Sequence, residues 1–213
     1  MNMFAYCLNN PIMRYDPSGC SDAWADMVED YGGEENLAIM IQLARYFANG
    51  DESGFSELYN MPVESAQREV RKINYNRAID KFDVENNYLP QIKEKITYTY
   101  CNYFAKAVSD EMFGANKGLQ GGNANTLYNW LPNEGWRGWK EVSISDAQQS
   151  ANNGFFTIAI YYEQPNGHVQ VIRPQRPTDT GFVCAQAGLS NYNYGPVMTT
   201  ATKPGVKYYT LKK

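Results

Sequence analysis

The feature that most constrains the fold of this chain is a change of hydrophobic periodicity near residue 96. Before it, apolar residues recur at the spacing of a helix, most clearly in the segment 36–48. After it, one short helical segment is followed by segments in which apolar and polar residues alternate, as they do in strands. One helix followed by a run of strands predicts an α+β fold with an antiparallel sheet. The predicted strands are 155–162, 168–173, 182–186 and 207–211.

Residues 20–95 are predicted to form a helical N-terminal region. The glycine-containing segment 50–54 interrupts the helical pattern, and Pro62 suits the first turn of the next helix. The region contains no pattern that indicates catalysis. We therefore interpret it as a prodomain, linker or lid that packs on the domain formed by residues 96–213.

Composition argues against several classes of function. The net charge is −4 and the Lys and Arg residues are scattered, which does not favour nucleic-acid binding. No apolar run reaches the length of about 18 residues that a membrane span needs, and the first residues lack the pattern of a signal peptide. The four cysteines form no CxxC pair and the chain has one histidine, so no metal site and no cofactor are expected. Cys184 lies in an apolar run and is interpreted as a small buried residue.

Cys101 lies where a β-like segment gives way to a helical one. Residues 104, 105, 107 and 108 form an apolar stripe at helical spacing, which predicts Cys101 at or near a helix N-terminus. The free N–H groups and the dipole at that end of a helix favour a thiolate and can bind an oxyanion. Cys101 is therefore the candidate nucleophile.

His168 opens an alternating strand and is the only histidine of the chain, so any histidine-dependent mechanism must use it. We interpret it as the general base. Gln186 lies on the next predicted strand, where its amide can orient the imidazole, as the third residue of a catalytic triad does. Asn191 and Asn193 are alternatives for that role.

Four further residues are candidates for substrate binding. Tyr100 and Asn102 flank the candidate nucleophile. Arg173 suits contact with a substrate carboxylate, and a surface position without such a contact is the alternative. Trp130, with two neighbouring tryptophans, suits the wall of a glycan or peptide groove, and a place in the core or in loop anchors is the alternative.

The first 19 residues resemble the end of the core region in Rhs/YD-repeat proteins, in which two turn-forming motifs close the repeat shell. In such proteins a variable effector, often a toxin, follows the second motif. The resemblance implies that the residues from 20 onward are a cargo domain. The residues that carry it are Phe4, Tyr6, Asn9, Asn10, Pro11, Asp16, Pro17, Ser18 and Gly19.

Residues 88–213 resemble the NlpC-type and CHAP-type peptidoglycan hydrolases. The resemblance rests on three motifs in order: C-N-Y-F from Cys101, G-H-V-Q-V-I-R-P around His168, and A-Q-A-G around Gln186. It implies a papain-like fold, in which a helix that bears the cysteine packs on a small antiparallel sheet that bears the histidine. It also implies that the three residues are nucleophile, base and orienting residue.

The same resemblance implies a substrate and a setting. The substrate would be a peptidoglycan stem peptide, cleaved between D-glutamate and a diamino acid or between muramic acid and L-alanine. The domain would act as an Rhs-type effector toxin delivered to the cell envelope of a target cell, with a cognate immunity protein as a possible partner. The family's commoner D-C-S/T motif differs here, because Tyr100 precedes and Asn102 follows the cysteine. That difference affects the cleavage specificity rather than the nucleophile.

Two other functions remain open from the sequence. The same Cys-His-polar arrangement serves deamidases, transglutaminase-like enzymes and acyltransferases that act on proteins. A non-catalytic wall-binding module, in which Cys101 is structural, is the second alternative. A nuclease is disfavoured, since the chain has one histidine and an acidic balance of charge.

Overall fold

The computed structural model describes residues 28, 29 and 31–212, so the predicted Rhs-like segment 1–19 lies outside the described residues. The chain divides into two compact units, 1–70 and 71–213. Helix α5 (Val63–Asp80) contributes residues to both units.

The first unit is helical. It contains α3 (Glu34–Ala48), α4 (Glu52–Tyr59) and the beginning of α5. Asp51 caps α4, because its carboxylate accepts a hydrogen bond from the N–H of Gly54 at 2.9 Å. The buried cluster of this unit is small and consists of Leu43, Leu58, Ala66 and Val70.

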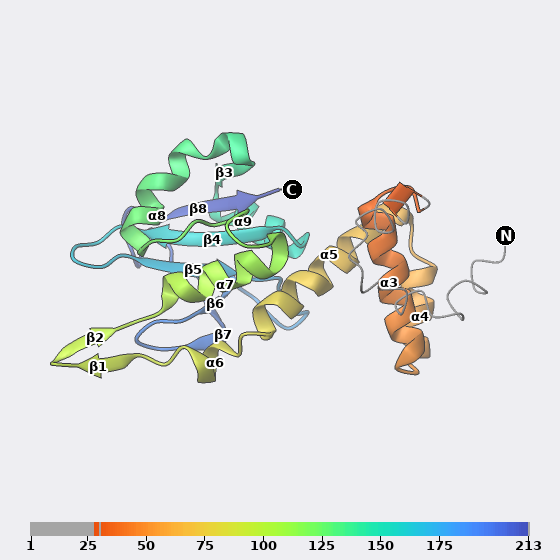
Figure 1. Cartoon of the computed structure of the whole chain (residues 1–213), viewed down its shortest axis with the longest axis horizontal. Coiled ribbons are helices and arrows are strands. Elements are labelled where there is room, and N and C mark those ends of the chain that lie inside the picture. Colours follow the sequence, from red (N-terminus) through yellow and green to blue (C-terminus); the bar gives the residue numbers. More distant parts are fainter. Residues whose placement is uncertain (1–27, 30, 213) are drawn as a thin grey trace, which may run out of the picture. The chain divides into compact units, whose positions relative to one another are not determined.

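The second unit combines helices with a six-stranded sheet whose strand order is β3-β8-β4-β5-β6-β7 (Figure 1). Every neighbouring pair is antiparallel, so the predicted α+β class with an antiparallel sheet is confirmed. The strands are β3 (Trp139–Val142), β4 (Phe156–Tyr161), β5 (His168–Ile172), β6 (Val183–Gln186), β7 (Tyr192–Pro196) and β8 (Lys207–Leu211). The helices that follow α5 are α6 (Val84–Asn87), α7 (Cys101–Phe113), α8 (Ala124–Trp130) and α9 (Ile144–Asn152). Among the described helices, none has the length and apolar character that crossing a membrane requires.

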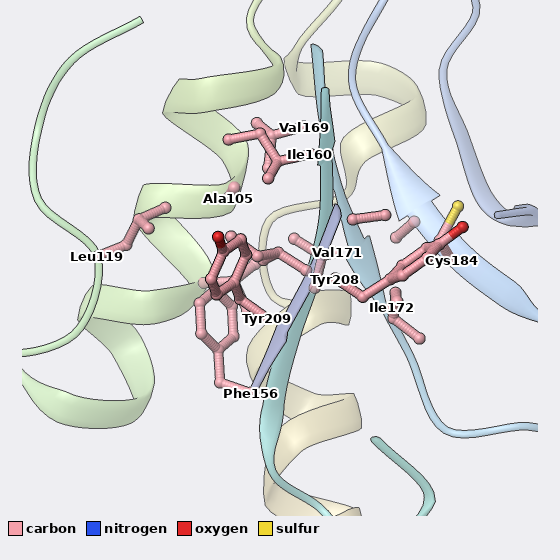
Figure 2. Close-up of a cluster of buried hydrophobic side chains, with 14 of the residues drawn as sticks. Ala105, Leu119, Phe156, Ile160, Val169, Val171, Ile172, Cys184, Tyr208 and Tyr209 are labelled. Atoms are coloured by element: carbon pink, nitrogen blue, oxygen red, sulfur yellow. The ribbon is translucent and has the colours of Figure 1, made fainter. Parts of the chain in front are cut away.

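The core of the second unit lies between the sheet and α7. All six residues of β4 are buried, and four of the five residues of β5 are buried. Figure 2 shows Ala105 of α7 on the side of the sheet that carries Ile160 and Val169. Close packing of these apolar faces supplies most of the stability of such a unit.

Helix α5 is joined to the sheet through Tyr75. The Tyr75 hydroxyl accepts a hydrogen bond from the N–H of Thr157 at 3.1 Å and donates one to the carbonyl of Ile172 at 2.6 Å. The phenol is fully buried and bridges the backbones of β4 and β5. The segment 71–80 therefore belongs to the core of the second unit.

The prediction that residues 20–95 are helical is wrong for their last part. Residues 91–93 and 96–98 form a two-stranded hairpin, β1 (Gln91–Lys93) with β2 (Ile96–Tyr98). Its turn residues Glu94 and Lys95 adopt φ values of 50° and 68°. Two-residue hairpin turns with positive φ at both residues usually contain Asn and Gly, which are absent here. Every residue of the two strands is exposed, so neither strand has a buried face. The hairpin therefore has neither the usual turn residues nor a buried face to indicate it in the sequence.

Candidate active site

Cys101 is the first residue of α7, and its side chain is buried. Tyr100 precedes the helix and provides no side-chain cap. The first N–H groups of a helix have no partner within it. Here the N–H groups of Cys101, Asn102 and Val169, the last in β5, each lower the pKa of the Cys101 thiol. The sulfur therefore lies near both the start of α7 and the start of β5.

Burial decides the ionisation of this thiol. Burial raises the pKa of Cys101 above its ordinary value, and the N–H groups of Val169, Asn102 and Cys101 lower it by less than that. The amides at the helix end thus favour the thiolate, as expected, but loss of solvation outweighs them in the resting site. Cys101 is a neutral thiol at rest and needs a base to become a nucleophile.

His168 begins β5, and Gln186 ends β6. Imidazole Nε2 lies 2.9 Å from Gln186 Oε1. The β5–β6 pairing joins Ile172 to Cys184 and Val171 to Ala185, and the pairing of β6 with β7 has a register irregularity between Cys184 and Gln186. Irregularities of this kind change the direction of a side chain relative to the strand. The structure therefore places the predicted orienting residue against the predicted base.

The environment of His168 keeps the imidazole neutral. Burial lowers the pKa of His168 below its ordinary value, the hydrogen bond with Gln186 raises it, and the positive charge of Lys203 lowers it further. A neutral imidazole can accept a proton on one ring nitrogen. That property is what a general base near neutral pH requires.

Cys101 and His168 meet through the backbone. The Cys101 sulfur interacts with the N–H of Val169, the residue that follows His168. Within residues 28–212, apart from residue 30, no hydrogen bond joins the thiol directly to the imidazole. Catalytic hydrogen bonds are often long or poorly aligned before substrate binds. The thiol and the imidazole thus lie near each other at the start of β5, without a hydrogen bond between them.

The two alternatives to Gln186 have other partners. Asn191 accepts a hydrogen bond from the N–H of Gly188 at 2.8 Å and donates one to the carbonyl of Val84 at 2.8 Å. Asn193 accepts from Arg173 and donates to Asp80 at 3.0 Å. Neither asparagine contacts the imidazole among the hydrogen bonds of the described residues.

Of the predicted substrate-binding residues, Tyr100 and Asn102 lie beside the thiol. The ring of Tyr100 packs edge-on against Tyr103, with 5.9 Å between centroids. Asn102 donates a hydrogen bond from its side chain to the carbonyl of Gly122 at 2.8 Å. Asn102 therefore holds the loop before α8 at the start of α7.

The tryptophans separate into different environments. Trp139 is buried in the core, which settles its role as a core residue rather than a groove wall. Trp130 is half-buried and packs edge-on against Trp139, with 6.4 Å between centroids. Trp136 is 80% exposed, and the guanidinium of Arg137 lies over its ring. Among the tryptophans of the described residues, Trp130 and Trp136 are thus the two that solvent reaches.

Both predictions for Arg173, contact with a substrate carboxylate and a surface position, are wrong. Its side chain is fully buried, so it lies neither at the surface nor in contact with a ligand-accessible space. The guanidinium donates hydrogen bonds to Asn193, to Asn76 at 3.1 Å and to Asp80 at 3.1 Å. It also stacks on the ring of Tyr194 at 3.6 Å from the centroid. Arg173 therefore connects the end of α5 to β7, a structural role.

Two neighbours of the imidazole were not anticipated from the sequence. Gly188 lies so close that a β-carbon at this position would be 3.2 Å from His168 Cε1. Gln170 is buried and donates a hydrogen bond to Gln186 Oε1 at 2.7 Å. The only sequence signal for Gln170 is its position two residues after His168, on the same face of the strand.

The comparisons add no identification. No protein-family model and no curated protein matches this chain. In the part of the chain that the structure describes, no group of three or more His, Cys, Asp or Glu side chains is arranged to hold a metal ion.

Proposed function

We propose that this chain is a cysteine hydrolase of amide bonds, with Cys101 as nucleophile, His168 as general base and Gln186 as the residue that orients the imidazole. The observation that carries the proposal is the 2.9 Å contact between His168 Nε2 and Gln186 Oε1. It lies beside the Cys101 thiol, whose pKa the N–H of Val169, the residue after His168, lowers. A papain-like arrangement, with the cysteine helix against an antiparallel sheet, is part of the proposal.

The proposed reaction begins with proton transfer. Because Nε2 of His168 is engaged by Gln186, Nδ1 takes the proton of the Cys101 thiol. The sulfur then attacks the amide carbonyl and forms a C–S bond, while the N–H groups of Cys101 and Asn102 are placed to stabilise the oxyanion. The C–N bond breaks as His168 donates its proton to the leaving amine.

The second half releases the acyl group. Water attacks the thioester carbonyl, and His168 Nδ1 takes the proton that water loses. The C–S bond breaks, the acid departs, and the proton returns from His168 to the Cys101 sulfur. No other reactant is needed, because the thiol proton leaves with the amine, and water supplies both the hydroxyl of the acid and the proton that restores the thiol.

The substrate part of the proposal rests on the resemblance to NlpC-type and CHAP-type enzymes. It makes the substrate a peptidoglycan stem peptide and the chain an effector of the Rhs kind, delivered to the cell envelope and opposed by an immunity protein. Acyl transfer follows from the residues at the site, whereas the cell wall follows from the sequence motifs alone.

The deciding experiment is mass spectrometry of the products after purified sacculi are incubated with the protein. We expect new muropeptides with the wild type and none with Cys101→Ala. Cys184→Ala is the matched control, because Cys184 is also a buried free thiol, with a pKa raised to about 12 by burial, and lies in β6 rather than in α7. It should leave the products unchanged.

Other outcomes distinguish the alternatives. Intact sacculi together with deamidation of a protein glutamine would indicate a protein substrate for the same three residues. Products that persist with Cys101→Ala would exclude Cys101 as nucleophile. The mass of each new fragment identifies the bond that is cleaved.

A further inference from the structure

Gln170 is oriented by a backbone group. It lies in β5 with 3% of its surface exposed, and its Oε1 accepts a hydrogen bond from the N–H of Met198 at 2.7 Å. A backbone N–H can only donate, so the oxygen of this amide must face Met198. The Nε2 of Gln170 therefore faces the other way, where it donates to Gln186 Oε1 at 2.7 Å and to the hydroxyl of Tyr192 at 3.0 Å.

Gln186 is oriented by a second backbone group. Its Nε2 donates to the carbonyl of Ser190 at 2.9 Å, and a carbonyl can only accept. Gln186 Oε1 consequently faces His168 and Gln170. Turning the Gln186 amide over would place its NH₂ against the NH₂ of Gln170 and its oxygen against the Ser190 carbonyl. Two repulsive contacts, the part-buried one with Gln170 and the exposed one with Ser190, oppose that reversal.

The two oriented amides decide which imidazole nitrogen carries the proton. Gln186 Oε1 can only accept hydrogen bonds, and it lies 2.7 Å from Gln170 Nε2 and 2.9 Å from His168 Nε2. His168 Nε2 must therefore be a donor, which leaves the lone pair of the neutral ring on Nδ1. We infer that Gln170 is a positioning residue that sets the tautomer of His168 by holding the Gln186 amide in one orientation.

The inference deepens the proposed function, on which its catalytic meaning rests, but the hydrogen-bond relay exists whether or not the site cleaves amides. A histidine whose Nδ1 keeps its lone pair can take a proton from a thiol. A histidine with the opposite tautomer would point an N–H at it. The relay thus has a spectroscopic readout that does not depend on any substrate.

The single histidine makes the test direct. In protein labelled with ¹⁵N only at histidine, NMR spectra contain the signals of His168 alone. Near neutral pH the wild type should show a proton bonded to Nε2 and slowed in its exchange with water, with Nδ1 unprotonated. Cys101→Ala should show the same pattern, which separates this inference from the proposed reaction.

Gln170→Met removes the donor while keeping the length of the side chain. We expect the Nε2 proton signal to broaden or vanish through exchange, and the shifts of the two nitrogens to move toward each other as both tautomers become populated. Gln148→Met is the matched control. Gln148 is 4% exposed and likewise accepts from a backbone N–H, that of Val183, at 2.8 Å, but it lies outside the relay. It should preserve the wild-type pattern.

Two results would overturn the inference. One is a wild-type ring protonated at Nδ1, which the first spectrum alone decides even where a variant does not fold. The other is a folded Gln170→Met protein with an unchanged His168 spectrum. Absence of hydrolysis together with the expected spectra would remove the proposed function and leave the positioning role of Gln170 in place.

Discussion

Gly188 packs against Cε1 of the His168 imidazole. Replacing Gly188 by alanine therefore tests how tightly the ring is held. A β-carbon there would lie 3.2 Å from His168 Cε1 and 3.7 Å from Gln186 Nε2. The ring must shift by a few tenths of an ångström, whereas the amide is at an ordinary contact distance. Under the proposed function, we expect Gly188→Ala to reduce kcat/KM for muropeptide release by roughly tenfold or more. Gly181→Ala is the control, since a β-carbon at that position meets nothing within 4 Å. Equal rates for the two variants would show that the ring position is not critical.

His168 also makes stability depend on pH. Its pKa in the folded state is lowered by burial below the ordinary value of 6.5, so the unfolded chain binds more protons in the window between the two values. The contribution of His168 to the free energy of unfolding should therefore be at its maximum above pH 6.5. It should decrease as pH drops below 6.5 through the folded-state pKa. Urea titrations at a series of pH values measure this slope. In His168→Asn the part of the slope near pH 6 should disappear, and an unchanged slope would contradict the prediction.

At the scale of elements, one tyrosine connects α5 to two central strands. Tyr75→Phe keeps the ring but removes the hydroxyl that serves the N–H of Thr157 and the carbonyl of Ile172. Two buried backbone groups would lose a partner, and we expect a loss of about 1–3 kcal/mol in the free energy of unfolding. Tyr98→Phe in the hairpin, where the side chain is 47% exposed, should change it by less than about 0.5 kcal/mol. Equal effects from the two variants in denaturant titrations would refute the bridging role.

The elements that sequence patterns predicted are those buried on both faces. Strands β4, β5, β6 and β8 lie inside the sheet and correspond to the four predicted segments. The two strands of this sheet that were not predicted, β3 and β7, are its edges. Edge strands are short and partly exposed, and β7 contains Gly195 and Pro196, which a strand pattern disfavours. Periodicity therefore located the centre of the sheet and not its limits.

Some features of the candidate site could also be predicted from the sequence, and others could not. Cys101 and His168 were predictable because one begins a clear helical stripe and the other is the only histidine of the chain. The buried position of Arg173 was not, because its acceptors Asn76 and Asp80 lie 97 and 93 residues away in sequence. The raised pKa of Cys101 was also beyond sequence reasoning. A helix start, whose N–H groups lower the pKa of a thiol, can be inferred from a sequence pattern. The desolvation that raises the pKa depends on which residues pack around the thiol.

At the scale of the whole molecule, the two units have separate buried clusters. The cluster of the first unit is Leu43, Leu58, Ala66 and Val70, and that of the second begins at Tyr75 and extends to Leu211. A fragment of residues 62–213 keeps α5 whole and retains every member of the second cluster. Since hydrophobic burial scales with the area removed from water, this fragment should hold its fold without α3 and α4. It should show the His168 spectrum of the full chain.

A fragment of residues 82–213 provides the contrast, because it differs only by loss of α5. It lacks Tyr75 and Ile79 from the core and leaves Arg173 without Asp80 and Asn76. A buried guanidinium deprived of its carboxylate costs on the order of 3–5 kcal/mol, a large part of the stability of a unit this size. We therefore expect 62–213 to unfold cooperatively in circular dichroism melts and 82–213 to show no transition. A cooperative transition in the shorter fragment would mean that α5 is an accessory rather than part of the fold that carries Cys101 and His168.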